Sequence, residues 1–224
     1  MKLYIIPTPI GNLEDITLRA LRILKEVDIV FCEDTRTTKN LLKHYEIDTK
    51  CYAYHINNEH QQVAQYVRWI QNGQQAALVS DAGTPGISDP GYLFIRECLV
   101  AGIEIECLPG ATALIPALVA SGFPCDKFYF HGFLPHKKGK ETALKMISER
   151  KETVVFYESP HRLLKTLTMM QNYFAPERKI CVSREISKVF EEHFRGTVQE
   201  GLAHFSGKGV KGEIVVVVEG VKTI

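Results

Sequence analysis

The chain has 224 residues, of which 45% are hydrophobic and 24% are charged, and its formal net charge is +1. These proportions are ordinary for a globular protein with one large core or two small ones. The near-zero charge excludes a protein-wide field that attracts polyanions, so a nucleic acid would have to be held by local basic patches.

The N-terminal segment is expected to begin the fold rather than to direct export. Its short apolar run ends at Pro7 and is too short for a signal peptide. No apolar run approaches the roughly 20 residues that span a bilayer. The cysteines form no C-x-x-C pair, which disfavours a zinc site and a disulfide framework. We therefore expect free thiols and a cytoplasmic location.

The first half of the chain alternates strand and helix patterns. Strands are predicted at 2–6, 28–32, 76–80 and 103–108. Helices are predicted at about 15–27, 37–44, 59–72, 91–101 and 111–121. Such alternation implies right-handed crossovers and a parallel sheet, so the fold class is α/β.

The second half follows a break at 121–128, where Gly and Pro interrupt the pattern. Strands are predicted at 128–133, 153–157, 179–183 and 213–219, and helices at about 139–150 and 160–173. A further strand over 189–198 would make this second sheet mixed. We therefore predict two domains, residues 1–121 and 122–224.

Three loops rich in glycine and proline each follow a predicted strand. They are PTPIGN at 7–12, SDAGTPGISDPG at 80–91 and LPGATA at 108–113. Ligands usually bind at the carboxyl ends of parallel strands, where glycine lets the backbone approach a ligand and proline makes the turn rigid. One such loop is most often only a tight turn, but three at one sheet edge indicate a binding site.

The sequence disfavours a phosphate site at this edge. It contains neither G-x-x-x-x-G-K-[ST] nor G-x-G-x-x-G after the first strand. A nucleoside triphosphate or NAD is therefore disfavoured. A ligand held mainly by backbone groups, with no pyrophosphate to neutralise, fits better, and S-adenosylmethionine is such a ligand.

Motifs along nearly the whole chain resemble one enzyme family. The series PTPIGN, SDAGTPGISDPG, LPGATA, VFYESPHR and KGEIVVVVEG is similar to that of the tetrapyrrole-methylase-type S-adenosylmethionine-dependent methyltransferases. Segments resembling the branch of that family that modifies small-subunit ribosomal RNA are CEDTRTTKNLL at 32–42, FHGFLPHKK at 130–138 and SREISKVFEEHFRG at 183–196. Ile186 and Ser187 depart conservatively from that pattern.

The resemblance implies a homodimer with S-adenosylmethionine in a cleft between an N-terminal parallel-sheet domain and a C-terminal mixed-sheet domain. It implies methylation of the 2′-hydroxyl of a cytidine in the decoding region of 16S small-subunit ribosomal RNA. The positions that it assigns to the cofactor are Pro7, Ile10, Asp81, Gly83, Thr84, Ile87, Gly110, Ala111, Thr112, Ala113, Tyr157, Glu158, Gly212 and Glu213.

Methyl transfer from a sulfonium requires the protein to hold the nucleophile and the methyl group in line and dry. A ribose hydroxyl is a weak nucleophile, so a positioned carboxylate is expected to assist. The candidates for this catalytic role are Glu33, Asp34, Glu158 and Glu185. Each has a structural alternative, because a carboxylate at such places can also cap a helix, bind the cofactor or pair with a basic neighbour.

Basic side chains in loops and near strand ends are candidates for RNA binding, because Lys and Arg facing phosphates supply most non-specific affinity. They are Arg36, Lys39, Lys137, Lys138, Arg162, Arg184, Lys188 and Lys211, with Lys208 beside the last. Runs such as 136–140 are as often solvated loops. Weaker candidates for stacking an extruded base are Tyr92, Phe133 and Tyr157, since aromatic residues at strand ends more often belong to the core. The histidines lack metal-ligand spacing, so no metal is expected.

Two alternatives remain open. The first keeps the cofactor but changes the substrate to a tetrapyrrole or a protein side chain, and the segments CEDTRTT and SREISKVFEEHFRG count against it. The second is a non-catalytic ribosome-associated module that binds the cofactor without turnover. A fold alone does not separate these functions.

Overall fold

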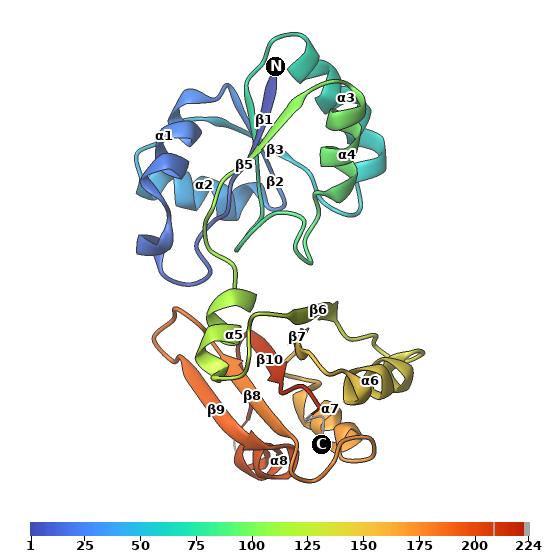
Figure 1. Ribbon diagram of the computed structural model, residues 1–224. Helices are drawn as coiled ribbons and strands as arrows, with labels where there is room; N and C mark the ends of the chain where they lie inside the picture. Colours follow the sequence, from blue (N-terminus) through green and yellow to red (C-terminus); the bar gives the residue numbers. More distant parts are fainter. Residues whose placement is uncertain (208, 222–224) are drawn as a thin grey trace. The chain divides into compact units, whose positions relative to one another are not determined.

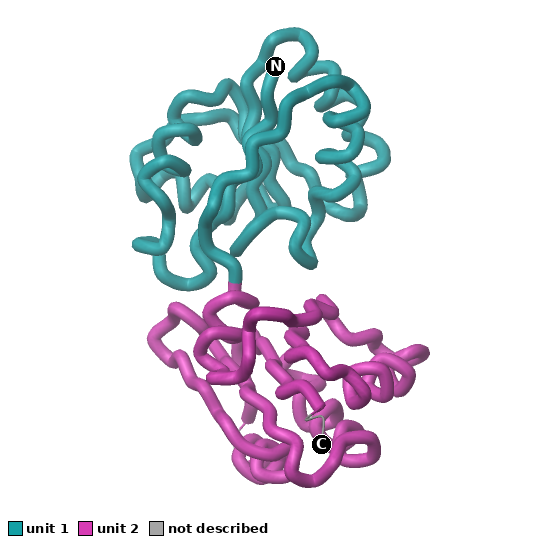
Figure 2. The backbone as a smooth tube through the Cα atoms, viewed as in Figure 1, with its two compact units in different colours: residues 1–112 teal, residues 113–224 magenta. Residues whose placement is uncertain are grey.

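The computed structural model describes residues 1–207 and 209–221, and the chain divides into two compact units, Met1–Thr112 and Ala113–Ile224 (Figures 1 and 2). The first unit is built on a five-stranded parallel sheet in the order β3-β2-β4-β1-β5. Its strands are β1 (Lys2–Ile5), β2 (Ile29–Cys32), β3 (Lys50–Ala53), β4 (Ala76–Val79) and β5 (Glu104–Cys107). Its helices are η1 (Leu13–Asp15), α1 (Leu18–Glu26), α2 (Thr35–His44), α3 (Glu59–Gln71) and α4 (Tyr92–Val100).

Helices cover both faces of this sheet, α1 and α2 on one and α3 and α4 on the other (Figure 1). The central strands β2 and β4 are buried at every residue, which explains their continuous apolar sequences. The predicted α/β alternation is confirmed. The strand β3 was not predicted because KCYA is a partly exposed edge strand with no apolar run.

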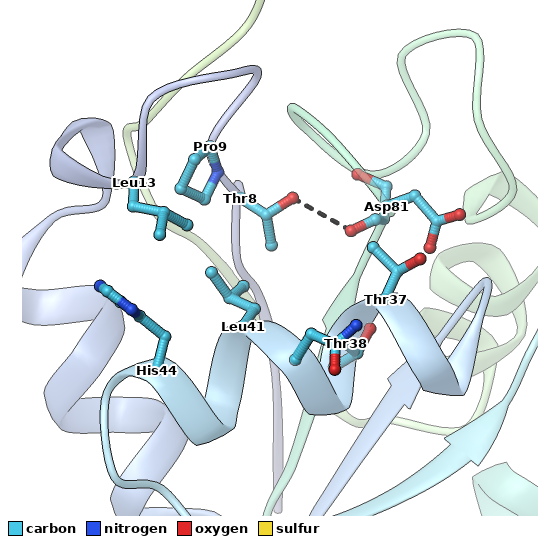
Figure 3. A pocket seen from close by; sticks show the side chains of 10 residues that line it. Thr8, Pro9, Leu13, Thr37, Thr38, Leu41, His44 and Asp81 are labelled. Carbon is cyan, nitrogen blue, oxygen red and sulfur yellow. Dashed lines mark hydrogen bonds between the residues drawn. The ribbon is translucent and has the colours of Figure 1, made fainter.

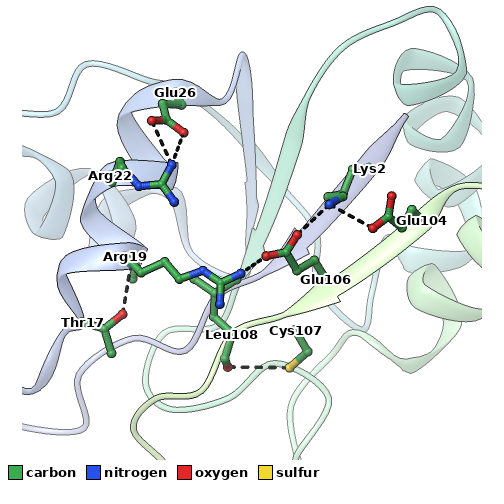
Figure 4. A network of polar contacts seen from close by, with 10 residues as sticks. Lys2, Thr17, Arg19, Arg22, Glu26, Glu104, Glu106, Cys107 and Leu108 are labelled. Atoms are coloured by element: carbon green, nitrogen blue, oxygen red, sulfur yellow. Dashed lines mark hydrogen bonds and ion pairs between the residues drawn. The ribbon is translucent and has the colours of Figure 1, made fainter.

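The strand β5 lies at the other edge of the sheet and is held by charged side chains (Figure 4). Lys2 on β1 forms ion pairs with Glu104 at 2.9 Å and with Glu106 at 2.7 Å, and Glu106 also pairs with Arg19 of α1. Charges along an edge strand disfavour pairing with another chain. The alternation of glutamate and apolar residues in IEIEC therefore has a structural origin.

The second unit contains a mixed five-stranded sheet in the order β6-β7-β10-β8-β9. The pair β6-β7 is parallel and the other pairs are antiparallel. Its elements are α5 (Leu114–Ser121), β6 (Phe128–Phe133), α6 (Lys140–Glu149), β7 (Thr153–Glu158), α7 (Leu163–Met170), β8 (Lys179–Arg184), β9 (Glu192–Thr197), α8 (Val198–Ser206) and β10 (Ile214–Val218). The mixed sheet expected from the segment 189–198 is confirmed.

One core of the second unit joins α6, α7 and α8 to alternate residues of β7, β8 and β10. The helix α8, which was not predicted, begins with a capping box in which the Thr197 hydroxyl accepts from the Glu200 amide at 3.2 Å.

The six cysteines are free thiols. Along the described residues, no helix is both long and apolar enough to cross a membrane.

The helix α5, expected to close the first domain, packs against β7, β8 and β10 of the second unit. It buries Leu114, Ala117 and Leu118, and Arg195 of β9 donates from Nε to its Ala120 carbonyl at 2.7 Å. The units therefore divide after Thr112 rather than after residue 121. The Gly-Pro stretch that led to the later boundary contains the end of this helix, where Gly122 adopts a φ of +75°.

Replacing Leu118 by Ala is expected to destabilise the second unit by about 2–4 kcal/mol, the usual cost of truncating a buried leucine. Val119→Ala is the matched control, because Val119 is 66% exposed on the same helix. Native-state hydrogen exchange should show faster exchange of β8 and β10 amides in Leu118→Ala only. Faster exchange confined to β1 and β4 would instead assign α5 to the first unit.

Candidate functional site

The three Gly-rich loops follow β1, β4 and β5, which are neighbours in the sheet. The backbone of Thr8 exchanges two hydrogen bonds with Gly83, each 2.9 Å long. The Thr84 hydroxyl donates to the Ala111 carbonyl at 3.0 Å. The loops thus form one connected platform at the carboxyl edge of the first sheet.

Glycine is required at two places in this platform. Gly83 has a φ of +86°, a conformation that other residues adopt at a cost. A Cβ on Gly110 would lie 2.7 Å from the Cβ of Pro7, so the third loop packs on the first only because this side chain is absent. These contacts fix the spacing of the loops.

The implied cofactor positions divide between the two units. In the first unit, Pro7, Ile10 and Gly83 are buried, Thr84, Ala111 and Thr112 are half-buried, and Asp81, Ile87 and Gly110 are exposed. In the second unit, Glu158 is buried, Ala113, Tyr157 and Gly212 are half-buried, and Glu213 is exposed. The first-unit residues all lie in the connected platform.

Carboxylates gather where β2 and β4 end. Asp34 caps α2, since its Oδ1 accepts from the Arg36 amide at 2.8 Å, and its Oδ2 pairs with the Arg36 guanidinium at 2.6 Å. These hydrogen bonds lower the pKa of Asp34 to about 2. The Asp34 amide in turn donates to Asp81 Oδ1 at 3.0 Å. Asp34 therefore stays ionised and links α2 to the second Gly-rich loop.

Glu33 stands in a different environment. Burial raises its pKa above the ordinary value, and the negative charge of Asp81 adds to this effect. Burial also raises the pKa of Asp81. A carboxylate with a raised pKa accepts a proton more readily, which suits a general base. Among the candidate carboxylates, Glu33 combines burial with a like-charged neighbour.

His55, two residues after β3, was considered from the sequence only as a metal ligand. Its charged form lowers the pKa of Glu33, which brings it electrostatically into the same cluster. Its Nδ1 atom is buried and finds no hydrogen-bond partner among the described residues. Only the position of this histidine close behind a strand could have indicated its place in the cluster, and that strand was not predicted.

Glu158 lies in a buried ionic network of the second unit. Its side chain is fully shielded from solvent. Its Oε1 accepts from Arg162 Nη2 at 2.7 Å and from the Ser159 amide at 2.8 Å. Its Oε2 accepts from the Thr166 hydroxyl at 2.5 Å and from Lys140 Nζ at 3.3 Å. With both oxygens occupied, this carboxylate acts as a structural anchor, and we do not advance it as the base.

Glu185 anchors a loop in the same unit. Its Oε1 accepts from Lys188 Nζ at 2.9 Å and from the Glu213 amide at 3.0 Å. The hydrogen bond from Lys188 lowers its pKa, which makes it a weak base. The side chain also lies against Gly212, where a Cβ would overlap it. Glu185 thus holds the turn of residues 185–188 against the start of β10.

The candidate RNA-binding residues fall into two groups. Those engaged within the second unit are Arg162 with Glu158, Arg184 with Glu192, and Lys188 with Glu185 and Glu213. Those exposed are Arg36, Lys39, Lys137, Lys138 and Lys211. Lys208 lies outside the described residues. The exposed pair on α2, Arg36 and Lys39, is next to the carboxylate cluster.

The aromatic candidates are more exposed than core residues usually are. Tyr92 is 71% and Phe133 is 54% exposed, and Tyr157 packs against Phe133 with ring centroids 5.4 Å apart. Over residues 1–207 and 209–221, no group of three or more His, Cys, Asp or Glu side chains is arranged to hold a metal ion.

The comparisons with known proteins agree on one family. A family model described as tetrapyrrole (corrin/porphyrin) methylases matches residues 2–201. Ribosomal RNA small subunit methyltransferase I of Synechocystis sp. is 46% identical, over 97% of this chain and 78% of the relative. The protein of that name from Thermotoga maritima is 44% identical, over 98% of both chains.

Two solved structures have the same fold. Uroporphyrin-III-C-methyltransferase from Thermus thermophilus matches with a TM-score of 0.68 and 21% identity, over 97% of this chain and 94% of that one. The cobalt precorrin-4 methyltransferase matches with a TM-score of 0.71 and 19% identity, over 97% and 94% of the two chains. They support the predicted fold class, an α/β fold with a parallel sheet followed by a mixed sheet.

Replacing Glu158 by Gln is expected to destabilise the protein by about 3–5 kcal/mol, because it leaves the buried Lys140 ammonium without a countercharge. Glu152→Gln is the control, since its pair with Arg150 is long, 3.9 Å, and exposed. Urea unfolding measures both changes. Equal midpoints for the two variants would show that the buried network contributes no more than a surface pair.

Proposed function

Because the chain belongs to the tetrapyrrole (corrin/porphyrin) methylase family, we propose that it methylates the 2′-hydroxyl of a cytidine in the decoding region of 16S ribosomal RNA, using S-adenosylmethionine. The observation that carries this proposal is the similarity, over 97% and 98% of this chain, to relatives named ribosomal RNA small subunit methyltransferase I, at 46% and 44% identity. The solved tetrapyrrole methyltransferases share only the fold at 19% and 21% identity. RNA is therefore a better-supported substrate than a tetrapyrrole.

The platform suits this cofactor chemically. Its three loops, 7–12, 80–91 and 108–113, contain no Lys, Arg or His but include the carboxylates Asp81 and Asp89. Such a surface is unfavourable for phosphates and favourable for a ligand that carries a cationic sulfonium and an ammonium group. When bound there, S-adenosylmethionine supplies an activated methyl group with a good leaving group.

The chain's own residues then position the nucleophile. Glu33 accepts the proton of the ribose hydroxyl, a role that its raised pKa favours. Asp34 remains ionised and holds the start of α2. Arg36 and Lys39, both exposed on α2, face the RNA phosphates. The base and the phosphate contacts thus come from one strand–helix segment, CEDTRTTK.

The proposal extends to partners and compartment. The assembled small subunit in the cytoplasm is the expected substrate, in keeping with the ribosomal RNA named for the relatives. A homodimer is included on the strength of the family resemblance. The exposed apolar pair Val189 and Phe190, 93% and 72% accessible, is available for an interface.

The direct test is transfer of labelled methyl groups to undermethylated small subunits, naked small-subunit RNA and a tetrapyrrole precursor, in parallel. The proposal expects label in 2′-O-methylcytidine from the subunits. Label on the tetrapyrrole alone would support the assignment of the cofactor and contradict the assignment of RNA as the substrate. Cofactor binding without label on any substrate would favour the non-catalytic module.

Gly83→Val is expected to weaken S-adenosylmethionine binding at least tenfold, because a branched side chain at a positive φ disturbs the loop and fills space beside Ile10 and Ala111. Gly102→Val is the control. Gly102 also has a positive φ, +73°, but it lies before β5, at the amino-terminal end of the strand and away from the three loops. Isothermal titration calorimetry measures both affinities. Equal loss in the two variants would mean that backbone strain, rather than the site, is responsible.

Glu33→Gln is expected to lower the methyl-transfer rate about 10²–10⁴-fold, the usual contribution of a general base. The same change should raise the free energy of unfolding at pH 7, because the folded state disfavours the ionised form of Glu33. This gain should vanish below the ordinary pKa of 4.5, where the carboxyl is protonated in both the folded and the unfolded state.

Glu26→Gln, at the exposed end of α1, is the matched control for rate and stability. Rates are measured with saturating cofactor, and stability by urea unfolding between pH 4 and pH 8. A normal rate in Glu33→Gln would transfer the role of base to another group.

A further inference from the structure

A cavity of about 340 Å³ lies within the first unit, beside the first Gly-rich loop (Figure 3). The segment after β1 contributes one side, the helix α2 the other, and Ser80 and Asp81 after β4 close one end. The Thr8 hydroxyl donates to the Ser80 carbonyl at 3.0 Å, which ties two of these walls together. The cavity is therefore enclosed by α2 and by the segments that follow β1 and β4.

This cavity is distinct from the positions implied for the cofactor. Among those positions only Asp81 lines it, and the others lie elsewhere in the three loops or in the second unit. Asp81 also raises the pKa of Glu33, the proposed base. The cavity thus adjoins the reacting end of the site without occupying the cofactor's place.

The walls of the cavity differ in chemistry. Pro9, Leu13 and Leu41 form an apolar part, suited to the face of a flat ring (Figure 3). The polar part comes from Thr37, Asn40 and His44, which are spaced three and four residues apart and so share one face of α2. In the part of the chain that the structure describes, no hydrogen bond occupies the side chains of Thr37 and Asn40.

The free amide of Asn40 matches the edge of a pyrimidine. Cytosine presents a ring-nitrogen acceptor next to an amino donor, and one carboxamide can bond to both. No Lys or Arg lines the cavity, whereas Arg36 and Lys39 are exposed on the same helix. The nucleotide base and the RNA phosphates therefore have separate places. The base lies inside the cavity, and the RNA backbone lies over the surface of α2. The volume is within the range of small-ligand pockets.

We propose that this cavity takes the base of the target nucleotide, a pyrimidine extruded from its stack, and that Asn40 reads its edge. The base is packed against Leu41 and Pro9, and its ribose faces Asp81 and Glu33. An enzyme that acts on a nucleotide within a structured RNA has to remove it from the stack, and the extruded base needs such a receptacle. This assignment rests on the proposed function and names its substrate subsite.

Two variants test the assignment. Leu41→Trp fills the cavity, and Asn40→Ala removes the amide while changing only an exposed side chain. Lys43→Ala, exposed on α2 outside the cavity, is the matched control. Each variant is first checked by thermal unfolding and by calorimetric titration with S-adenosylmethionine, and is then assayed on undermethylated small subunits.

The assignment expects kcat/KM for the subunit to fall at least 100-fold in Leu41→Trp and about tenfold in Asn40→Ala, while Lys43→Ala is unchanged. Cofactor affinity should stay within twofold of wild type in all three. On subunits with uridine in place of the target cytidine, Asn40→Ala should show a smaller preference for cytidine than wild type does.

Three outcomes would overturn the assignment, and they are distinguishable. Wild-type kcat/KM in Leu41→Trp would show that the cavity is empty during catalysis. Cofactor affinity reduced tenfold or more in a folded Leu41→Trp, with normal turnover in Asn40→Ala, would give the cavity to the cofactor. A wild-type enzyme that binds the cofactor but methylates no RNA would remove the proposed function, and the base subsite with it.

Discussion

The main-chain bridge between Thr8 and Gly83 is the constraint on which the candidate site depends. It can form only because β1 and β4 are parallel neighbours, so the loops that follow them emerge together. The third loop is then fixed by the contact of Gly110 with Pro7 and by the Thr84–Ala111 hydrogen bond. In this site the backbone sets the positions of the loops, and side chains contribute contacts around them.

The four candidate carboxylates show how the environment assigns roles to identical chemical groups. Glu158 is saturated by buried donors, and Asp34 and Glu185 are held ionised by hydrogen bonds. Glu33 is left with burial and a like-charged neighbour, which together favour proton uptake. Position in a motif could not separate these cases, because each residue ends or follows a strand and is near a basic side chain.

Much of the fold could be predicted from the sequence, because long apolar runs such as AALV and IVVVV leave little choice of structure. The failures occur where the local signal is weak or misleading. The edge strand KCYA has no apolar run, and its identity as a strand comes from pairing with β2. The helix α8 does carry a sequence signal, the Thr197–Glu200 capping box, although no helix was predicted there.

The helix α5 shows a different limit. Its apolar pattern predicts a helix but not the sheet on which it packs, because that choice depends on distant residues such as Arg195. The site shows the same division. The platform loops could be found from their glycines, whereas the pairing of Lys140 with Glu158, 18 residues apart, required the fold. Local sequence specifies elements, and tertiary contacts specify partners.

The main-chain character of the platform also bears on which substitutions it tolerates. Since Thr8 and Gly83 are joined through their backbones, the bridge does not depend on the Thr8 side chain. The bridge therefore tolerates a change of side chain at Thr8, whereas the contact of Gly110 with Pro7 and the Thr84–Ala111 hydrogen bond depend on side chains. The likeness to the cobalt precorrin-4 methyltransferase, at 19% identity, is one of fold alone. In this chain, peptide groups join the first two loops, and side chains of α2 line the neighbouring cavity.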